Sequence, residues 1–577
     1  MRWIFVFFIL TSFASWSQEG SGDIKLNQIG FYPGTKKMAV TTAQASGDKF
    51  YILSSNEKDT VYRGTLSEKR QSAYSSTQTR IADFSDLRKT GNYFVFVPGI
   101  GKSYAFRIAD HVTHDLAVSV LKGFYFMRSN IPLDKKYAGK WARPPGHPDT
   151  AVEIHPSAAS EQRPAGTIIS TPGGWYDAGD YNKYIVNSGI SVGTLLSAWE
   201  DFPDYFKNIR TNIPESADAI PDILNEALYN LRWMRTMQDP NDGGVYHKCT
   251  NAIFDGWVMP GVTKAPRYVV QKSTAAALDF AAVMAQSARI FSKFKLQLPG
   301  LSDSCLTGAK KAWEWAKIHP QVLYNQREMN NHYDPDILTG DYGDRHIDDE
   351  WLWAAAELFV TTNSPEYFSV VKEKFNQPAS TPSWGNVTML AYYTFLRSPV
   401  HLSVDGKLIL QSMKDTVLRL ANAFISKSAS NAFATVMGQN RGDFVWGSNA
   451  VAANQGILLI NTYQLTHDKK YLEGALSNLD YILGKNATGY CFVTGAGKKS
   501  PMHPHHRPSV ADGIEEPVPG LLVGGPNPGR QDNCPYPFTE AETSYVDSDC
   551  AYAANEIAIN WNAPMVYLAH AIEALVK

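Results

Sequence analysis

The hydrophobic periodicity of this chain of 577 residues changes once, and this change constrains the fold more than any other feature. Residues 23–108 contain short runs of β-branched and aromatic residues separated by Gly, Ser, Asn and Asp, which is typical of a small β-sandwich. From about His111 the period becomes 3.6, and about twelve helices follow. We therefore predict a multi-domain protein with an all-β domain over residues 22–108. An all-α domain over residues 111–577 follows, in which antiparallel helix pairs could close into a ring.

The N-terminus has the form of a secretory signal peptide. Arg2 precedes an apolar run from Trp3 to Leu10, and small residues follow at Ser15 and Ser17. We expect residues 1–17 to be removed and the protein to be secreted, periplasmic or held at the cell surface. No later segment approaches the ~20 apolar residues of a transmembrane helix.

Export would place the cysteines in an oxidising compartment. There are five of them, so at least one is unpaired. Free buried cysteines are the default expectation, and if a disulfide forms, Cys534 and Cys550 are the pair that we expect to bridge.

The charge of the chain favours a neutral or weakly charged substrate. The formal net charge is -2, which provides no basic field for nucleic acid or an anionic membrane. The chain contains 14 Trp, 29 Tyr and 27 Phe, and although most should lie in the core, such residues also stack on sugars.

A pair of carboxylates lies in the segment GGWYDAGDYNKY, where Asp177 and Asp180 are three residues apart. In a purely structural interpretation, Asp180 caps a helix that begins at about Tyr181. In the functional interpretation both carboxylates are ionised and hold one water, and Asp180 takes its proton. Trp175 and Tyr176 favour the functional interpretation, because a helix cap does not need large aromatic neighbours.

A third carboxyl group lies about 380 residues further on, in AYAANEIAINWN. This pattern predicts that Tyr552, Glu556 and Ile559 share one helical face, with an acidic group where an apolar contact would be expected. An apolar pocket would raise the pKa of Glu556, so that it could protonate a leaving oxygen. A solvated Glu near a helix N-terminus is the alternative. An acid and a carboxylate pair are the components of an inverting glycosidase.

Basic residues cluster in MHPHHR, which contains His503, His505, His506 and Arg507. The spacing lacks the arrangement of two histidines four residues apart on one helix face, and no cysteine is near, so a zinc site is disfavoured. His505 and Arg507 fit better as hydrogen-bond donors to sugar hydroxyls. A solvated basic loop is the alternative.

Together these motifs resemble the signatures of glycoside hydrolase family 9, an inverting cellulase family with an (α/α)6 barrel. The resemblance is carried by DAGD after GGWY, by PHHR, and by the Y-x-D-x(4)-Y-x(3)-E pattern that ends at Glu556. LNQIGFYP, from Leu26, is similar to the start of the immunoglobulin-like module that precedes the barrel in one branch of the family. The resemblance is therefore nearly full-length.

The resemblance implies a role for each residue that matches a family motif. Asp180 would be the general base, Asp177 the second carboxylate that holds the water, and Glu556 the general acid. His505 and Arg507 would bind substrate near the scissile bond. We also assign the following residues to the substrate-binding site: Trp175, Tyr176, Asp547, Tyr552 and Trp561.

The resemblance also bears on metals, although the chemistry itself needs no cofactor. The segment YGDRHIDDEWLW resembles a place where some family members hold calcium, and Asp349 and Glu350 would be its ligands. A solvated acidic helix start is the alternative. Zinc is not expected, because Ser129 and Gly146 occupy positions where zinc-binding members have cysteines.

We therefore predict an endo-β-1,4-glucanase (cellulase) that cleaves cellulose or a related β-glucan with inversion. Exo-acting alternatives in the same family are a cellobiohydrolase, a β-glucosidase and an exo-glucosaminidase, and loops within residues 140–180 and 488–548 could block the site to produce them. A carbohydrate-binding protein without catalysis is the alternative from another class, but the three intact carboxyl groups disfavour it. The β domain has no obvious aromatic strip, so we expect it to be a scaffold packed on the barrel. The sequence makes no prediction about oligomeric state.

Overall fold

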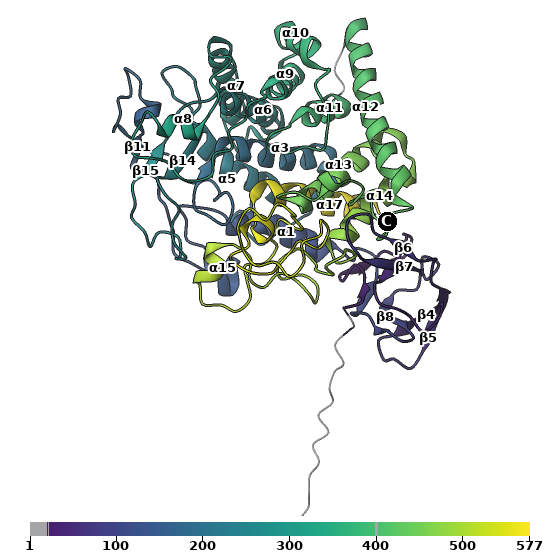
Figure 1. Cartoon of the computed structure of the whole chain (residues 1–577). Coiled ribbons are helices and arrows are strands. Elements are labelled where there is room, and N and C mark those ends of the chain that lie inside the picture. Colours follow the sequence, from purple (N-terminus) through teal and green to yellow (C-terminus); the bar gives the residue numbers. More distant parts are fainter. Residues whose placement is uncertain (1–19, 21, 399–401, 577) are drawn as a thin grey trace, which may run out of the picture.

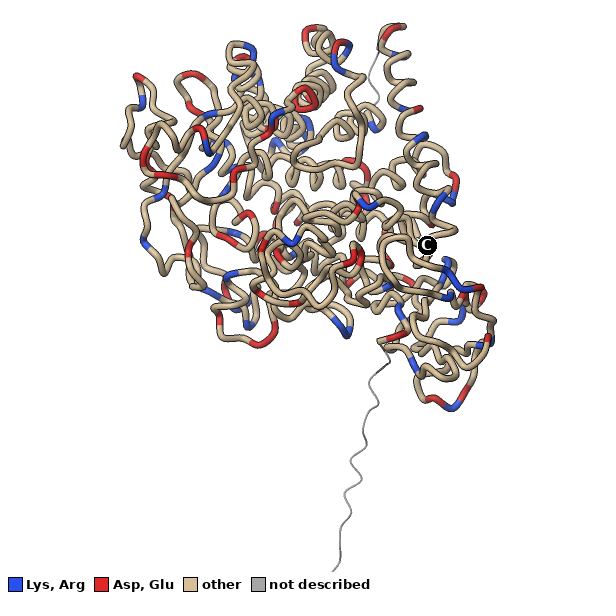
Figure 2. Tube along the Cα trace, in the orientation of Figure 1, with Lys and Arg blue, Asp and Glu red and all other residues tan. Residues whose placement is uncertain are grey.

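The computed structural model describes residues 20, 22–398 and 402–576. A small β domain packs beside a much larger helical domain (Figure 1). Acidic and basic residues are interspersed over both domains (Figure 2). The predicted signal peptide lies outside the described residues.

The β domain is a sandwich of two sheets. One sheet has the order β1 (Ile24–Lys25), β3 (Met38–Thr41), β7 (Gln78–Asp83), β6 (Arg70–Gln71). The other has the order β2 (Gly30–Phe31), β10 (Phe106–Ile108), β8 (Gly91–Val97), β4 (Lys49–Ser54), β5 (Thr60–Thr65), with β9 (Gly101–Lys102) paired to β8. Alternate residues of β4 and β8 are fully buried, as in a strand with one face on the core. The predicted β-sandwich is confirmed.

Twelve helices of ten or more residues lie in the described part of the helical domain. Six of them are buried along almost their whole length: α3 (Ile185–Asp201), α6 (Thr274–Phe291), α9 (Asp348–Thr362), α11 (Thr388–Arg397), α13 (Ser448–Thr466) and α17 (Ile559–Leu575). The other six pack outside them: α5 (Asp222–Thr236), α7 (Leu301–Ile318), α10 (Pro365–Lys374), α12 (Val404–Ser428), α14 (Lys469–Ile482) and α1 (His114–Phe126).

The helices form six inner–outer pairs that close into a ring. Five pairs are consecutive in sequence: α3 with α5, α6 with α7, α9 with α10, α11 with α12 and α13 with α14. The sixth joins the two ends of the domain, because α17 contacts α1 as well as α3. Alanine-rich inner faces allow this close approach. The predicted ring of antiparallel pairs, an (α/α)6 barrel, is confirmed.

A small sheet interrupts the helical domain, which the sequence analysis did not predict. Its order is β12 (Ile168–Ile169), β11 (Val152–Ile154), β15 (Arg267–Val269), β14 (Lys248–Asn251), β13 (Lys183–Tyr184). β11, β14 and β15 lie beside α8 (Gln326–Asn330) at the left of Figure 1. Strands of two to four residues carry no recognisable alternation. This sheet leads directly into the segment that carries Asp177 and Asp180.

The β domain contacts the last turn of α14 and the loop that follows it. The amide of Asn27 donates to Asp480 Oδ1 at 2.9 Å. Gln28 donates to the carbonyl of Gly489 at 2.9 Å, and its Oε1 accepts hydrogen bonds from the backbone N–H groups of Lys498 and Lys499. These contacts agree with the scaffold role expected of this domain.

Two of the five cysteines depart from the default expectation of free thiols. Cys534 and Cys550 form a disulfide, which confirms the expected pair, and Cys249, Cys305 and Cys491 are free and buried. None of the helices in the described ranges is long and apolar enough to cross a membrane.

Candidate active site

Asp177 and Asp180 lie in an irregular segment between β12 and β13 of the small sheet, just before α3. The next helix begins only at Ile185, with Tyr184 as its N-cap residue, so the prediction that Asp180 caps a helix was wrong. Gly173 and Gly174 have φ values of 79° and 82°, which explains why glycines precede the segment. Both carboxylates are therefore held by a turn rather than by a helix.

Glu556 lies at a break between two helices. α16 (Tyr552–Asn555) ends just before it, Glu556 is extended with φ -72° and ψ 156°, and α17 begins at Ile559. The prediction that Tyr552, Glu556 and Ile559 share one helical face was therefore wrong. The break has a consequence, because extended backbone here forms bridges with the chain at His505 and at Val523.

The segments that carry the three carboxyl groups meet directly. The N–H of Gly179 donates to Glu556 Oε1 at 3.3 Å, and the N–H of Ile559 donates to the carbonyl of Asp177 at 2.9 Å. Arg507 donates to the carbonyl of Gly179 through its backbone N–H and through Nη1. A Cβ on Gly179 would lie 2.2 Å from the carbonyl oxygen of His505, so only glycine fits between them.

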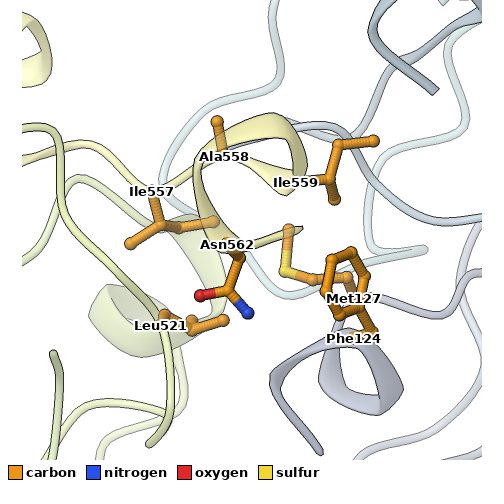
Figure 3. Close-up of a pocket in the computed structure, with 7 residues that line it drawn as sticks. All are labelled: Phe124, Met127, Leu521, Ile557, Ala558, Ile559 and Asn562. Atoms are coloured by element: carbon orange, nitrogen blue, oxygen red, sulfur yellow. The ribbon is translucent and has the colours of Figure 1, made fainter. Parts of the chain in front are cut away.

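Apolar residues pack against the chain segment that follows Glu556. Ile557, Ala558 and Ile559 surround a cavity of about 10 Å³ together with Phe124 and Met127 (Figure 3). This volume has room for one water at most, and the lining is mainly apolar. The backbone that carries Glu556 therefore has little space in which to shift.

The two aspartates differ in their hydrogen bonds. Asp177 accepts from Asn187 Nδ2 at 2.6 Å on Oδ1 and from the Tyr342 hydroxyl at 2.7 Å on Oδ2. Asp180 accepts from Asn182 Nδ2 at 2.6 Å and from the Tyr184 hydroxyl at 3.1 Å, both on Oδ2. Within the described ranges no hydrogen bond reaches Asp180 Oδ1. Asp180 thus keeps one free oxygen, whereas both oxygens of Asp177 are occupied.

Burial and mutual repulsion shift the carboxyl groups towards their protonated forms. Burial, followed by the charges of Asp180 and Asp177, raises the pKa of Glu556 well above its ordinary value. Burial, followed by the charge of Asp180, raises the pKa of Asp177 to about 8. Near neutral pH, Glu556 therefore carries a proton, as an acid must. The raised pKa of Asp177 favours its protonated form as well, whereas we expected both aspartates to be ionised.

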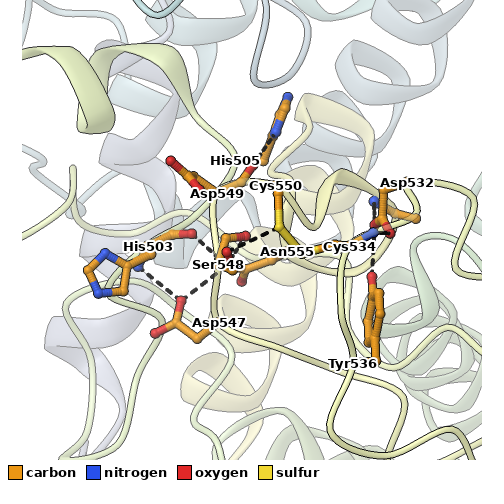
Figure 4. The surroundings of a disulfide bond; sticks show 11 residues. His503, His505, Asp532, Cys534, Tyr536, Asp547, Ser548, Asp549, Cys550 and Asn555 are labelled. Carbon is orange, nitrogen blue, oxygen red and sulfur yellow. Dashed lines mark hydrogen bonds between the residues drawn. A yellow bond between two sulfur atoms is a disulfide. The ribbon is translucent and has the colours of Figure 1, made fainter.

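His505 lies beside the carboxyl groups and belongs to a row of four rings. Its ring centroid is 4.8 Å from that of Trp257 and 5.7 Å from that of Tyr552, and Tyr552 lies 5.5 Å from Trp446. Trp257 and Trp446 are each 43% exposed. His505 Nδ1 is 2.6 Å from the carbonyl oxygen of Asp549 and must donate to it (Figure 4). Because burial also lowers the pKa of His505, its Nε2 is an acceptor rather than the predicted donor.

Two of the residues assigned to substrate binding hold the DAGD segment and the histidine loop, and a third packs against the start of α13. Arg507 is 8% exposed and donates through Nε to the carbonyl of Asp255 as well as to Gly179. Asp547 accepts from the N–H groups of Met502 and His503 and from Asn555 Nδ2 (Figure 4). Trp561 packs against Gly447 and Gly524.

Trp175 and Tyr176 do not line the site. Their exposed fractions are 0% and 1%, so neither ring is open to substrate, and this assignment is corrected. Trp175 packs on Phe124 at 4.5 Å between ring centroids and donates through Nε1 to Glu226. The rings form the base of the turn that presents the aspartates.

Sequence reasoning missed the residues that hold the aspartates. Asn182 and Tyr184 belong to the segment that drew attention, and Asn187 follows within a turn of helix, so their polar side chains in a buried stretch were an available signal. Tyr342 comes from a loop about 165 residues away, and nothing in its local sequence indicates the contact. The exposed Trp257 was also missed.

The acidic residues proposed for calcium are buried. Asp349 and Glu350 are 6% and 0% exposed, so the alternative of a solvated helix start was wrong. Neither oxygen of Glu350 receives a hydrogen bond from an amide, hydroxyl or cationic group, and Asp279 Oδ1 and Asp344 Oδ2 have no partner either. Among the residues that the structure describes, no group of three or more His, Cys, Asp or Glu residues is arranged to hold a metal ion.

A ring of paired helices that brings one half-buried carboxylic acid to a pair of aspartates is the arrangement of a glycoside hydrolase. The chain belongs to glycosyl hydrolase family 9, whose model matches residues 114–569. A model of the cellulase N-terminal ig-like domain matches residues 19–102. The family resemblance drawn from the motifs is confirmed.

Relatives match along nearly the whole chain. A xyloglucan-specific endo-beta-1,4-glucanase of Bacteroides ovatus is 46% identical over 100% of this chain and 98% of its own. Endoglucanase D of Acetivibrio thermocellus is 34% identical over 94% of this chain and 82% of its own. A solved structure of a family 9 protein from Bacteroides ovatus superimposes with a TM-score of 0.92 at 46% identity, covering 96% of this chain and all of that one.

Proposed function

We propose that this protein is an inverting endo-β-1,4-glucanase, with xyloglucan as its preferred β-glucan. The observation that carries the proposal is the meeting of Glu556 with the Asp177–Asp180 turn, through the hydrogen bond from Gly179 and the bond from Ile559 to Asp177. An acid and a carboxylate pair brought together from opposite ends of a domain are the groups that inverting glycoside hydrolysis needs.

In this proposal, Glu556 is the general acid and Asp180 the general base. Glu556 enters the reaction protonated because its pKa is raised, and it protonates the departing glycosidic oxygen. Asp180 accepts a proton from the attacking water through its free Oδ1, while Oδ2 stays bound to Asn182 and Tyr184. Asp177 contacts the same water, held in place by Asn187 and Tyr342.

Endo action is supported by the row of rings from Trp257 through His505 and Tyr552 to Trp446. Two of these rings are 43% exposed, and exposed aromatic faces are suited to stacking on sugars. A row that continues on both sides of His505 favours binding along a chain rather than at its end. The preference for xyloglucan rests on the similarity to the Bacteroides ovatus enzyme over the full length of both chains. Export by the N-terminal segment is proposed as well, and it agrees with the Cys534–Cys550 disulfide.

The substrate and the mode of action are tested together by a product profile. We expect the enzyme to lower the viscosity of xyloglucan well before reducing ends accumulate, and to act more slowly on carboxymethyl cellulose, mixed-linkage glucan and chitooligosaccharides. NMR of the first products should show the α-anomer, because inversion of a β bond gives it. Release of a single small sugar without loss of viscosity would instead identify an exo-acting enzyme, and initial β-anomer would exclude inversion.

Calcium is proposed as a structural ion beside the start of α9. The fit rests on Glu350, whose two oxygens both lack donors, and on Asp349 beside it, where burial raises the pKa of both groups. Backbone carbonyls would have to complete the ligand set, because the described residues form no group of three or more carboxylates arranged to hold an ion. Hard oxygen ligands of this kind suit Ca²⁺. Asp349 would join Glu350 as a ligand, and a bound cation would remove the repulsion within the cluster.

Calcium addition should therefore raise the melting temperature of protein that has been treated with a chelator. An excess of free calcium about a hundredfold above Kd contributes about 2.7 kcal/mol, which is a shift of several degrees at most for a protein of this size. The shift should vanish in Glu350→Gln and persist in Asp348→Asn, which replaces an exposed neighbour. An equal shift in both variants, or none in the wild type, would contradict the proposed ligands.

A further inference from the structure

Asn182 is a buried amide between the catalytic turn and the small sheet. It is 2% exposed and immediately precedes β13. Its carbonyl accepts a hydrogen bond from the N–H of Asp177 at 3.1 Å, and its side-chain Nδ2 donates to Asp180 Oδ2 at 2.6 Å. This one residue therefore contacts both members of the carboxylate pair.

The orientation of the Asn182 amide is fixed by the groups on its other side. Its Oδ1 accepts hydrogen bonds from the N–H of Asn251 at 2.9 Å, from Arg267 Nη1 at 3.1 Å and from the Thr250 hydroxyl at 3.1 Å. A backbone N–H and a guanidinium can only donate, so the atom that faces them must be the amide oxygen. The NH₂ group then has to face Asp180.

Arg267 is itself anchored by a buried ion pair. Its Nε and Nη2 bind the two oxygens of Asp149 at 3.0 and 3.2 Å, and Asp149 also binds Lys183 Nζ at 2.7 Å. Bidentate pairing fixes the plane of a guanidinium more firmly than a single contact would. Arg267 lies in β15, Asn251 in β14 and Lys183 in β13, so three strands of the small sheet converge on Asn182.

We propose that Asn182 is a positioning residue for the general base, and that it acts by holding Asp180 Oδ2 so that Oδ1 faces the attacking water. Tyr184 supports the same oxygen at 3.1 Å, but its hydroxyl rotates about one bond and provides a weaker constraint. The inference rests on the proposed role of Asp180. It also gives the small sheet a purpose, because the sheet delivers the donors that set the orientation of the amide.

The charge environment of Asp180 decides what the loss of Asn182 should do. Asp180 interacts electrostatically with groups from several elements: Asp177, Tyr184, Lys248, His505 and Glu556. Burial lowers the pKa of Lys248 to about 7, and that of His505 is lowered too, so neither is a strong cation at neutral pH. The hydrogen bond from Asn182 is therefore an important source of stabilisation for an ionised Asp180.

The test is the pH dependence of kcat/KM for Asn182→Ala on a soluble β-glucan. Loss of a hydrogen bond to a charged group should lower kcat about 10- to 100-fold. The acid limb should move to higher pH by about one unit, because the ionised base is less stabilised. KM should change by less than about threefold, since Asn182 is too deeply buried to touch substrate. Asn251→Ala is the matched control, because it removes a side-chain amide partner of Arg267 without a contact to Asp180, and its acid limb should stay in place.

Asn182→Asp decides the question if the alanine variant fails to fold. It keeps an oxygen for Arg267, Thr250 and Asn251 but removes the donor to Asp180 and can add a like charge, so the acid limb must again move to higher pH. An acid limb that stays in place in Asn182→Asp, or in a folded Asn182→Ala of reduced activity, would overturn the inference. If Asp180→Asn kept most of the activity, the role of Asp180 itself would fail, and this result is distinguishable because it does not involve Asn182.

Discussion

Replacing Glu556 with glutamine is expected to lower kcat on polysaccharide by about two to four decades, the usual contribution of a general acid. Glutamine preserves the shape of the side chain and can still interact with the N–H of Gly179, but it has no proton to transfer. On an aryl glycoside whose leaving group departs without protonation, the loss should be much smaller. This difference between substrates identifies an acid, whereas a purely structural defect would slow both reactions equally.

The same substitution should stabilise the fold at neutral pH. In the unfolded chain a glutamate ionises above about pH 4.3, whereas burial and the two aspartates keep Glu556 protonated to a much higher pH in the folded protein. Between those values the native state binds more protons than the unfolded state, so the native state loses stability as pH rises. Glutamine avoids this cost. Because Glu556 is partly exposed, we expect a gain of about 1–2 kcal/mol at pH 7 that disappears near pH 4.

Chemical denaturation of both proteins at pH 4 and pH 7, combined with kinetics on the two substrates, tests this prediction. Glu515→Gln is the control, because Glu515 is an exposed glutamate of the C-terminal loop region. It should change neither activity nor the pH dependence of stability. If Glu556→Gln kept most of its activity on polysaccharide, Glu556 would not be the acid.

The sequence predicts the architecture well because the periodicity that defines each layer is local. Long runs such as STAAALDFAAVMAQSARIF show a helix that is buried all round, and α6 is such a helix. The small sheet was missed because its strands are too short to show alternation, and because distant segments pair in it: Lys183 of β13 pairs with Cys249 of β14, which is 66 residues away. The local sequence does not show which distant segments will pair as strands, and this small sheet is formed almost entirely by such pairs.

The same contrast holds for the candidate site: the sequence identifies its reactive residues, but only the three-dimensional structure shows where they lie. The three carboxyl groups could be found from their motifs, since each is an acidic residue in an unusually polar or aromatic setting. Helical periodicity misplaced Glu556 because the chain breaks between Asn555 and Ile559 in order to bridge to His505, which is a tertiary contact. Trp175 and Tyr176 were assigned to substrate because their position near the aspartates says nothing about which side of the turn they occupy. The contact between Tyr342 and Asp177 joins residues 165 positions apart, so it can be identified only from the folded structure.

Replacing Asp180 with asparagine is expected to lower kcat by about two to four decades, and by more than the equivalent change at Asp177. Asp180 has a free oxygen with which to accept a proton from water, whereas both oxygens of Asp177 are occupied by Asn187 and Tyr342. Burial and the charge of Asp180 also raise the pKa of Asp177 to about 8, which favours its protonated form near neutral pH. Asparagine at position 177 therefore replaces a neutral group with a neutral group.

Kinetics of the two variants at several pH values, with substrate binding measured separately, separate these roles. Both variants should bind the glucan about as well as the wild type, since water activation contributes to the transition state and not to ground-state binding. Asp177→Asn should leave the acid limb near its wild-type position, because the raised pKa of Asp177 already favours its neutral form and the substitution removes no like charge from beside Asp180. Equal losses in the two variants would mean that the aspartates share the proton of the water, and a larger loss at Asp177 would reverse their assignment. The comparison is informative because the two side chains lie on one turn and differ chiefly in which of their oxygens remain free.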